Sequence, residues 1–364
     1  MPAASAVELV ARCHCGHFDL HISLAADELP QRKTICVCDS CRYGTGTLGV
    51  VTVTLPGPPA ADVLDALTLR EMKAGSKLRY RCPTCGANAL GRITGPDGKP
   101  IYTVYVGLLS QLAGVVEIVG FEYCEGLGDT GVAAFLPELP VYSGKADESP
   151  LVPPLRKAPA TGVQQATEQL YVRCDCGSID LSVSRPADDA EAAYCYIKPP
   201  PTAGGVATRF LTTSCACTSC RTTTGSCLPA HAVTHVPWQN LHEASDPAVP
   251  LLTGDWSPQV TLPGAVAYHS SDKTTRYRCA GDCGASLGIV TAAMPGILKV
   301  STGLLHAPEG PRAESWAFWW TRTDEPDSKM PPTINAADEA LDQALMRDWL
   351  AGLKRWGIEN GLRS

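Results

Sequence analysis

The stretch that decides the fold of this chain is CVCDSCR, at residues 36–42. It returns as CACTSCR at residues 215–221, with three cysteines and an arginine at the same spacing. Three further motifs recur in the same order: RCHCG at 12–16 as RCDCG at 173–177, RYRC at 79–82 as RYRC at 276–279, and GLL at 107–109 as GLL at 303–305. Such ordered recurrence predicts two tandem copies of one cysteine-rich unit.

The spacing of these motifs divides the chain. The first unit is predicted at residues 8–142, a proline-rich linker at 143–169, the second unit at 170–323 and a C-terminal tail at 324–364. In the tail, apolar residues at helical spacing predict an amphipathic helix over residues 336–356. We expect this helix to pack on one of the units, and a partner-binding helix is the alternative.

Both units are predicted to be mainly β. The chain has 364 residues, with 33 glycines and 30 prolines, a composition that favours short strands and turns over long helices. Residues 18–24 alternate between apolar and polar side chains, as expected for a half-buried strand.

Charge and hydropathy limit the partners and the location. The net charge is −7 and no cluster of Lys and Arg is present, which argues against nucleic acid or an anionic membrane as a partner. Residues 1–12 lack the pattern of a signal peptide, and no apolar run approaches the roughly 20 residues that span a bilayer. We therefore expect a cytoplasmic protein that acts on a small molecule.

Cysteine usage indicates metal binding. Of 17 cysteines, 14 lie in short clusters, and only Cys124, Cys195 and Cys227 stand apart. Clustered thiols in a reducing compartment are typical of metal ligands rather than of disulfides. Two distant pairs in each unit suit a closed, structural zinc site with four thiolates. The predicted ligands are Cys13, Cys15, Cys82 and Cys85 in the first unit and Cys174, Cys176, Cys279 and Cys283 in the second.

The local three-cysteine motifs suggest a different kind of site. Cys36, Cys38 and Cys41, like Cys215, Cys217 and Cys220, offer three thiolates and leave the fourth position of a tetrahedral ion open. Such a soft site suits a substrate thiol. The chain could then hold up to four zinc ions. The alternative is a fourth protein ligand that closes each site, with Cys227 as the main candidate in the second unit.

The three motifs C-x-C-G, C-x-C-x-x-C-R and C-x-x-C-G together resemble the glutathione-dependent formaldehyde-activating enzyme (GFA) family, also called the CENP-V/GFA domain, of Mss4-like fold. The resemblance covers both units. It implies that the four-cysteine sets hold structural zinc and that the three-cysteine sets hold catalytic zinc, which receives the glutathione sulfur. It also implies a carbon–sulfur lyase activity. The sequence departs from the family pattern at the widened Cys279–Cys283 pair and in its long insertions. It also carries GLLS at 107–110 and GLLH at 303–306 where the family commonly has G-T-L-D. These departures favour a substrate other than formaldehyde, either a larger electrophile or a thioether.

Several side chains are candidates for substrate binding or proton transfer. Arg42 and Arg221 directly follow the open motifs and could hold a substrate carboxylate, or instead hydrogen-bond the thiolates or the backbone. His231, His235, His269 and His306 are candidates for a general acid or base. The leading hypothesis is a zinc-dependent lyase acting on a glutathione adduct. A zinc hydrolase or dehydratase acting on a non-sulfur substrate and a non-catalytic zinc scaffold are the alternatives.

Overall fold

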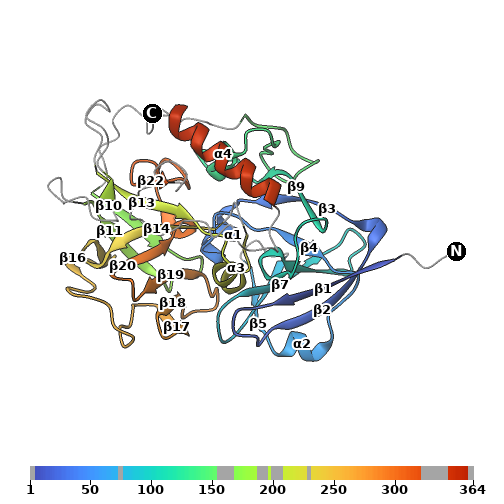
Figure 1. Cartoon of the computed structure of the whole chain (residues 1–364), viewed down its shortest axis with the longest axis horizontal. Coiled ribbons are helices and arrows are strands. Elements are labelled where there is room, and N and C mark those ends of the chain that lie inside the picture. Colours follow the sequence, from blue (N-terminus) through green and yellow to red (C-terminus); the bar gives the residue numbers. More distant parts are fainter. Residues whose placement is uncertain are drawn as a thin grey trace.

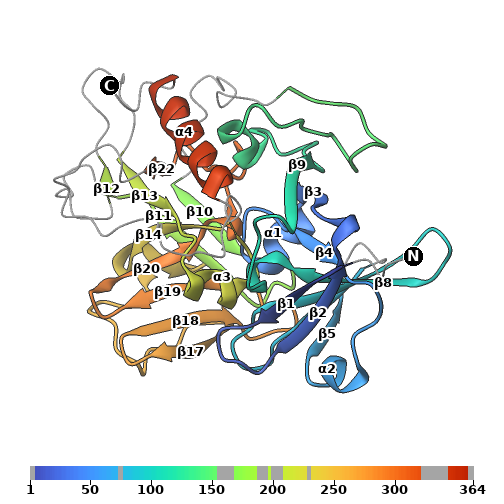
Figure 2. The same cartoon turned by 45° about the vertical axis from the view of Figure 1, so that its right-hand side comes forward.

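A computed structural model of the chain describes residues 5–72, 77–153, 168–186, 196–197, 208–227, 231–320 and 343–359. The fold is mainly β, as predicted. Figure 1 and Figure 2 show two β-rich halves side by side, with helices α1 and α3 between them and helix α4 across one side. We call the described residues of 5–153 the first half and those of 168–320 the second half.

The first half is built from three small sheets. β1 (Ala6–Arg12) pairs antiparallel with β2 (Asp19–Ala25), and β3 (Gln31–Cys36) runs parallel to β9 (Val116–Glu122). The third sheet has the order β4-β8-β7-β6-β5, made of β4 (Thr52–Thr54), β5 (Thr68–Glu71), β6 (Lys77–Arg81), β7 (Asn88–Thr94) and β8 (Pro100–Tyr105). The helical segments are η1 (Ala26–Glu28), α1 (Asp39–Thr45), α2 (Ala61–Asp65), η2 (Val106–Leu108) and η3 (Gly131–Phe135).

The second half repeats this plan with additions. Its strands are β10 (Gln169–Arg173), β11 (Asp180–Ser184), β12 (Tyr196–Ile197), β13 (Arg209–Ser214), β14 (Ala232–Pro237), β15 (Leu241–Glu243), β16 (Asp246–Pro250), β17 (Ala265–Ser271), β18 (Thr274–Cys279), β19 (Ser286–Thr291), β20 (Met294–Ser301), β21 (Leu305–His306) and β22 (Ala317–Trp320). Its helical segments are α3 (Thr218–Thr224), η5 (Trp238–Asn240) and η6 (Thr302–Leu304).

The two halves correspond element by element. The β10–β11 hairpin matches β1–β2, and the parallel pair β13–β22 matches β3–β9. The order β14-β20-β19-β18-β17 matches β4-β8-β7-β6-β5. This agreement fits the tandem duplication indicated by the sequence. The main described addition is the connection from β14 to β17, whose strands β15 and β16 extend the sheet of β11.

Helix α4 (Gln343–Glu359) confirms the predicted C-terminal helix, and the predicted residues 336–342 lie outside the described ranges. Although it follows the second half in sequence, α4 packs on η3 of the first half. Phe135 contacts the rings of Trp349 and Trp356 edge-on, at centroid distances of 5.0 and 5.2 Å. Gly352 lies directly on the backbone of Phe135, where an added Cβ would be 1.6 Å from the carbonyl oxygen. The apolar stripe of the helix therefore serves the core.

Buried apolar side chains of both halves and of α4 form one continuous core. Two polar contacts at equivalent positions also join the halves. Arg70 forms an ion pair with Asp175 at 2.6 Å, and both side chains are only 10% exposed. At the matching place, the Tyr268 hydroxyl lies 3.0 Å from the Nδ1 atom of His14. The two halves are therefore packed against each other and are not separate domains joined only by a linker.

Candidate metal centres

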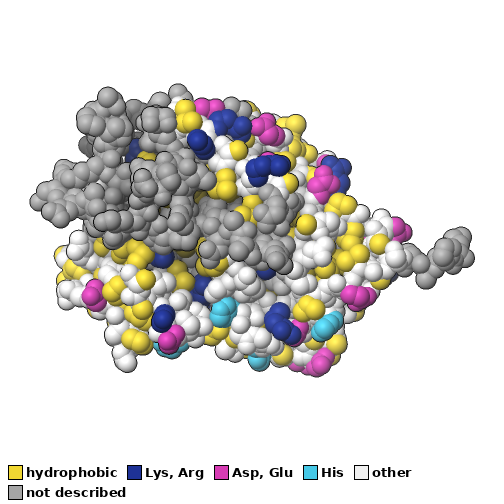
Figure 3. Space-filling model, viewed as in Figure 1, with side chains coloured by type: hydrophobic (Ala, Val, Ile, Leu, Met, Phe, Trp, Pro, Cys, Tyr) yellow, Lys and Arg dark blue, Asp and Glu magenta, His cyan; other side chains and the backbone are white. Residues whose placement is uncertain are grey.

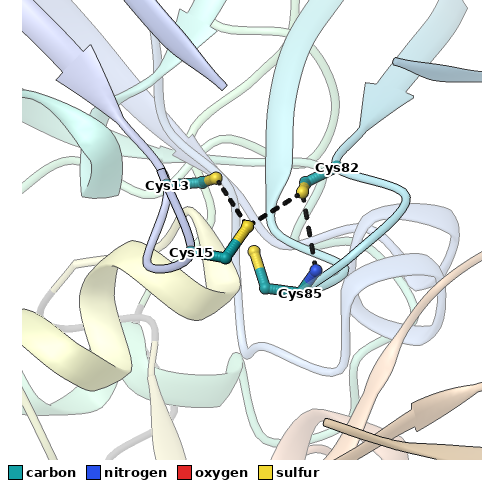
Figure 4. A group of neighbouring side chains, drawn as sticks. All are labelled: Cys13, Cys15, Cys82 and Cys85. Carbon is teal, nitrogen blue, oxygen red and sulfur yellow. Dashed lines mark hydrogen bonds between the residues drawn. The ribbon is translucent and has the colours of Figure 1, made fainter. Parts of the chain in front are cut away.

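The four cysteines predicted for the first closed site do come together. Cys13 and Cys15 lie in the turn between β1 and β2, and Cys82 and Cys85 lie in the turn between β6 and β7. The Sγ atom of Cys15 is 3.5 Å from that of Cys13 and 3.5 Å from that of Cys82. In Figure 4 the four side chains point toward one another from these two turns. All four sulfur atoms lie within 4.8 Å of one another.

The second closed set has the same arrangement in spite of its wider motif. Its sulfur atoms belong to Cys174, Cys176, Cys279 and Cys283 and also lie within 4.8 Å of one another. The extra residue is accommodated because the turn contains Gly281. An added Cβ there would lie 2.3 Å from the hydroxyl of Ser178 and 3.0 Å from the sulfur of Cys176. A larger residue here would press on these two side chains, so glycine leaves room for the wider turn to close around the four sulfurs.

These distances suit a metal ion. Sulfur atoms in a disulfide are about 2.05 Å apart, whereas the closest pairs here are separated by 3.3 to 3.6 Å. A tetrahedral zinc ion with Zn–S bonds of about 2.3 Å would place its sulfur ligands about 3.8 Å apart. The donor sets thus fit four-thiolate metal sites.

The two three-cysteine clusters also form, and each is built in the same way. The first cysteine stands at the end of β3 or just after β13, the second is the N-cap residue of α1 or α3, and the third lies in the first turn of that helix. The sulfur-to-sulfur distance is 3.5 Å both for Cys36–Cys38 and for Cys215–Cys217. In α3 the backbone N–H of Cys220 donates to the sulfur of Cys217 at 3.5 Å. The helix N-terminus thus favours the thiolate form.

Neither three-cysteine cluster gains a further ligand from the residues that the structure describes. Among the described Cys, His, Asp and Glu side chains, none adds a further ligand atom within 4.8 Å of all three sulfurs. Cys227 instead lies on the wall of an apolar cavity of about 370 Å³, with Val106, Leu112 and Met346. Burial raises the pKa of the Cys227 thiol to about 12, which keeps it protonated at neutral pH. The proposed closure of the second site by Cys227 is therefore not seen.

We expect Cys227→Ser to leave the metal content of the protein unchanged, because its sulfur is remote from the cluster. Cys217→Ser is the matched control and should remove one exchangeable ion. Metal analysis of both variants after reconstitution with zinc gives the comparison. A loss of metal in Cys227→Ser equal to that in Cys217→Ser would contradict this placement.

Basic side chains surround each three-cysteine cluster. In the second half, the guanidinium of Arg276 donates to the sulfur of Cys220 at 3.6 and 3.8 Å and to the Ser219 hydroxyl at 2.8 Å. Burial lowers the pKa of the nearby Lys299, and the thiolates of the cluster oppose this shift.

In the first half, the equivalent Arg79 donates to the Tyr105 hydroxyl at 2.9 Å and to the sulfur of Met72 at 3.5 Å. Burial disfavours the charge of the neighbouring Lys77, but the thiolates of Cys36 and Cys41 outweigh it and raise the pKa of the lysine. These positive charges offset the negative charge of three thiolates.

The two arginines that follow the open motifs are buried and differ in their partners. Arg221 donates through Nη1 to the carbonyl oxygens of Gly107 at 2.6 Å and Leu109 at 2.9 Å, both in the first half. Arg42 donates to Asp39 at 2.7 Å and to the Tyr43 hydroxyl at 3.0 Å. The contacts of Arg221 match the backbone alternative, and a role in carboxylate binding stays a prediction for both.

The candidate histidines are spread over the second half. His231 lies nearest to an open cluster, with Nδ1 at 3.1 Å from the carbonyl oxygen of Cys215. His235 and His269 are hydrogen-bonded to threonine hydroxyls. His306 stacks on the ring of Tyr43 in the first half, at a centroid distance of 4.0 Å. Of these four, only His231 is placed beside a cluster.

Sequence reasoning missed the cluster arginines, although a signal for them exists. The repeated RYRC motif places Arg79 and Arg81, and likewise Arg276 and Arg278, two residues apart on a strand. Side chains at this spacing share one face of the strand. A basic face next to a cysteine turn in both copies could have marked these arginines as neighbours of the metal centres.

The fold and the centres define a mainly β protein with four cysteine groups that could hold metal ions. Residues 8–120 match the model of the family described as glutathione-dependent formaldehyde-activating enzyme. The match confirms the resemblance over these residues and points to a glutathione-related, metal-binding function. No curated protein and no solved structure matches the chain.

The described surface adds two observations. On the face shown in Figure 3, Lys and Arg side chains are scattered among acidic and uncharged ones. Within the described ranges, no helix combines the length and the apolar character needed to cross a bilayer.

Proposed function

We propose that the chain is a zinc-dependent enzyme of the carbon–sulfur lyase type, which makes or breaks a bond between the glutathione sulfur and the carbon of a small molecule. The observation that carries this proposal is the pair of three-sulfur clusters with no further ligand from the described residues. The family match of residues 8–120 supports glutathione as the thiol.

Each open cluster has the parts that this chemistry needs. Cys36, Cys38 and Cys41 would hold one zinc ion, and Cys215, Cys217 and Cys220 would hold another. The ion held there would supply Lewis acidity that keeps a sulfur ligand in its thiolate form. A zinc ion with three thiolates carries a net charge of −1, which disfavours ionisation of water and favours a soft ligand.

Residues of the chain would then handle charge around the reacting sulfur. The N-termini of α1 and α3 direct N–H groups toward the clusters, and Arg79 and Arg276 add positive charge at short range. When the sulfur adds to a carbonyl carbon, an S–C bond forms, the C=O π bond breaks, and the oxygen takes up the proton that the thiol released. The reverse step breaks the S–C bond and returns that proton. In the second half, His231 is the nearest candidate to carry it.

The remaining parts of the proposal follow from the same sites. With all four groups filled, the chain binds four zinc ions, two structural and two exchangeable. Its partner is a small-molecule glutathione adduct, with no role for nucleic acid or a membrane. A cytoplasmic location suits 14 clustered cysteines, because thiols stay reduced there.

Cobalt substitution tests this function directly, because cobalt(II) reports its ligands through absorption bands. We expect glutathione to change the cobalt spectrum by adding a thiolate ligand at the open clusters. S-methylglutathione, which has no free thiol, should leave the spectrum unchanged. The double variant Cys38→Ser/Cys217→Ser should lose the glutathione response and keep the bands of the four-thiolate sites. An unchanged spectrum on addition of glutathione would refute sulfur binding at these clusters.

A further inference from the structure

The helix that carries Cys220 ends against the first half. The last carbonyl groups of a helix have no partner within it and need donors from elsewhere. Here the backbone N–H of Gly107 donates to the carbonyl oxygen of Gly225 at 2.9 Å, and the side-chain amide of Asn88 donates to that of Thr224 at 2.9 Å. Both donors belong to the first half. The C-terminal end of α3 is thus completed by the neighbouring unit.

The helix that carries Cys41 belongs to the first half and is contacted in turn by the second half. α1 lies against η6 of the second half, as α3 lies against η2 of the first half. The contact is closest at Gly303, where an added Cβ would lie 2.3 Å from the carbonyl oxygen of Thr47 and 2.7 Å from the carbonyl carbon of Gly46. At the matching position, a Cβ on Gly107 would lie 2.3 Å from the carbonyl carbon of Gly225. The glycines of the two GLL motifs therefore permit the close approach of η6 to the end of α1 and of η2 to the end of α3.

The turns that carry the cysteines of the closed sites, which we call the closed cysteine turns, also contact the opposite half. His14 lies between Cys13 and Cys15, and its N–H donates to the carbonyl oxygen of Thr222 on α3 at 3.1 Å. Figure 4 shows this helix, in yellow, beside the four cysteines of the first half.

The second half makes the equivalent hydrogen bond to the first half. The N–H of Asp175, between Cys174 and Cys176, donates to the carbonyl oxygen of Tyr43 on α1, also at 3.1 Å. Each closed turn thus contacts the helix of the opposite open cluster.

Two arginines join the closed cysteine turn that contains Cys82 and Cys85 to the one that contains Cys279 and Cys283, across the boundary between the halves. Arg81 donates to the carbonyl oxygens of Gly281 and Asp282, both at 3.3 Å. Arg278 donates to the carbonyl oxygen of Pro83 at 2.8 Å. The contacts between the halves therefore involve both turns of each closed site.

From these contacts we propose that the open clusters are supported crosswise: each half positions the three cysteines of the other half through its GLL turn and its closed cysteine turn. Gly107 and Asn88 are then positioning residues for Cys215, Cys217 and Cys220, and Gly303 is one for the first cluster. The proposal rests on metal binding by the open clusters, which is part of the proposed function.

The test measures cobalt affinity at one open cluster at a time. Cys38→Ser leaves only the second cluster intact, and Cys217→Ser leaves only the first. In these backgrounds we would introduce Gly107→Ala and Gly303→Ala and measure the dissociation constant of exchangeable cobalt by competition with a chelator. Loss of a group that orients metal ligands typically weakens binding about 10–100-fold. We expect Gly107→Ala to cause such a loss at the second cluster and to change the first by less than about twofold. Gly303→Ala should do the reverse.

Matched controls and a milder variant accompany this pair. Gly57→Ala and Gly254→Ala should change neither affinity, because nothing lies within 4 Å of an added Cβ at either position. Asn88→Ala removes only one donor, to Thr224, and should weaken the second cluster even if Gly107→Ala fails to fold.

Two outcomes would overturn the proposal. If each substitution weakens the cluster of its own half, or both clusters equally, crosswise support is wrong while the proposed function stands. If neither cluster binds cobalt with the glycines intact, the proposed function and this inference fall together.

Discussion

We expect Cys15→Ser and Cys176→Ser to lower the melting temperature of the protein by more than about 10 °C, through the loss of several kcal/mol of metal-linked stability. The reason is that each closed site joins two turns that are distant in the sequence. Cys15 and Cys82, whose sulfurs lie 3.5 Å apart, are 67 residues apart along the chain. Binding of zinc to four thiolates contributes about 10–16 kcal/mol in small zinc-binding peptides, and most of that is folding free energy.

Cys38→Ser and Cys217→Ser are the matched controls for this prediction. Each removes one thiolate from a cluster whose three cysteines lie within six residues, so little chain is held together by the metal. Their melting temperatures should stay close to that of the parent protein, and calorimetry of all four variants gives the comparison. Equal destabilisation by both pairs would show that the open clusters are structural and would remove the main support for an enzyme.

The second large effect is expected for Arg312→Met. Arg312 and Asp129 are fully buried, with 3.9 Å between the nearest charged atoms, and Arg312 also donates to the carbonyl oxygen of Gly131 at 2.7 Å. Burial raises the pKa of Asp129 to about 6, and the arginine opposes that shift. Arg312 also pairs with Glu314, whose Oε1 lies 2.5 Å from its Nε atom. Removal of the arginine leaves both carboxylates without this charge partner, and breaking a buried pair in this way costs about 3–5 kcal/mol. Denaturant unfolding should show this loss.

The exposed pair of Arg347 and Asp348 provides the control. Their side chains are 75% and 61% exposed, and such pairs contribute about 0–1 kcal/mol. Arg347→Met should therefore be nearly neutral. The double variant Asp129→Asn/Arg312→Met should recover part of the loss, because it removes the more deeply buried of the two carboxylates that lose Arg312. If Arg312→Met proves as mild as Arg347→Met, the buried pair does not join the halves as the structure indicates.

The four cysteine groups were predictable from the sequence because cysteines are rare in proteins and are closely spaced in these motifs. The C-x-C and C-x-x-C motifs fix which sulfurs can meet, and the β-rich composition follows from short alternating runs such as residues 18–24. The order of the repeated motifs assigned the wider Cys279–Cys283 pair to its set in spite of its different spacing, and the structure groups these sulfurs in that way.

The arrangement of the halves had no such signal. Arg221 reaches Gly107 across 114 residues of sequence, and nothing in either local pattern marks the partner. The register of the parallel pair β3–β9 is likewise a non-local property. Cys227 was considered as a ligand because it is near Cys220 in sequence, yet the chain after α3 leads it into the apolar cavity instead.

The contacts Arg70–Asp175 and Tyr268–His14 stand at equivalent places and differ in chemistry. In a homodimer of identical subunits, any substitution at a symmetric contact appears on both sides at once. Within a single chain that constraint is absent, and here one contact is an ion pair while its counterpart joins a ring nitrogen and a hydroxyl. The same freedom extends to the open clusters. If the proposed function holds, each cluster is free to differ in its substrate, although each depends on the other half for its support.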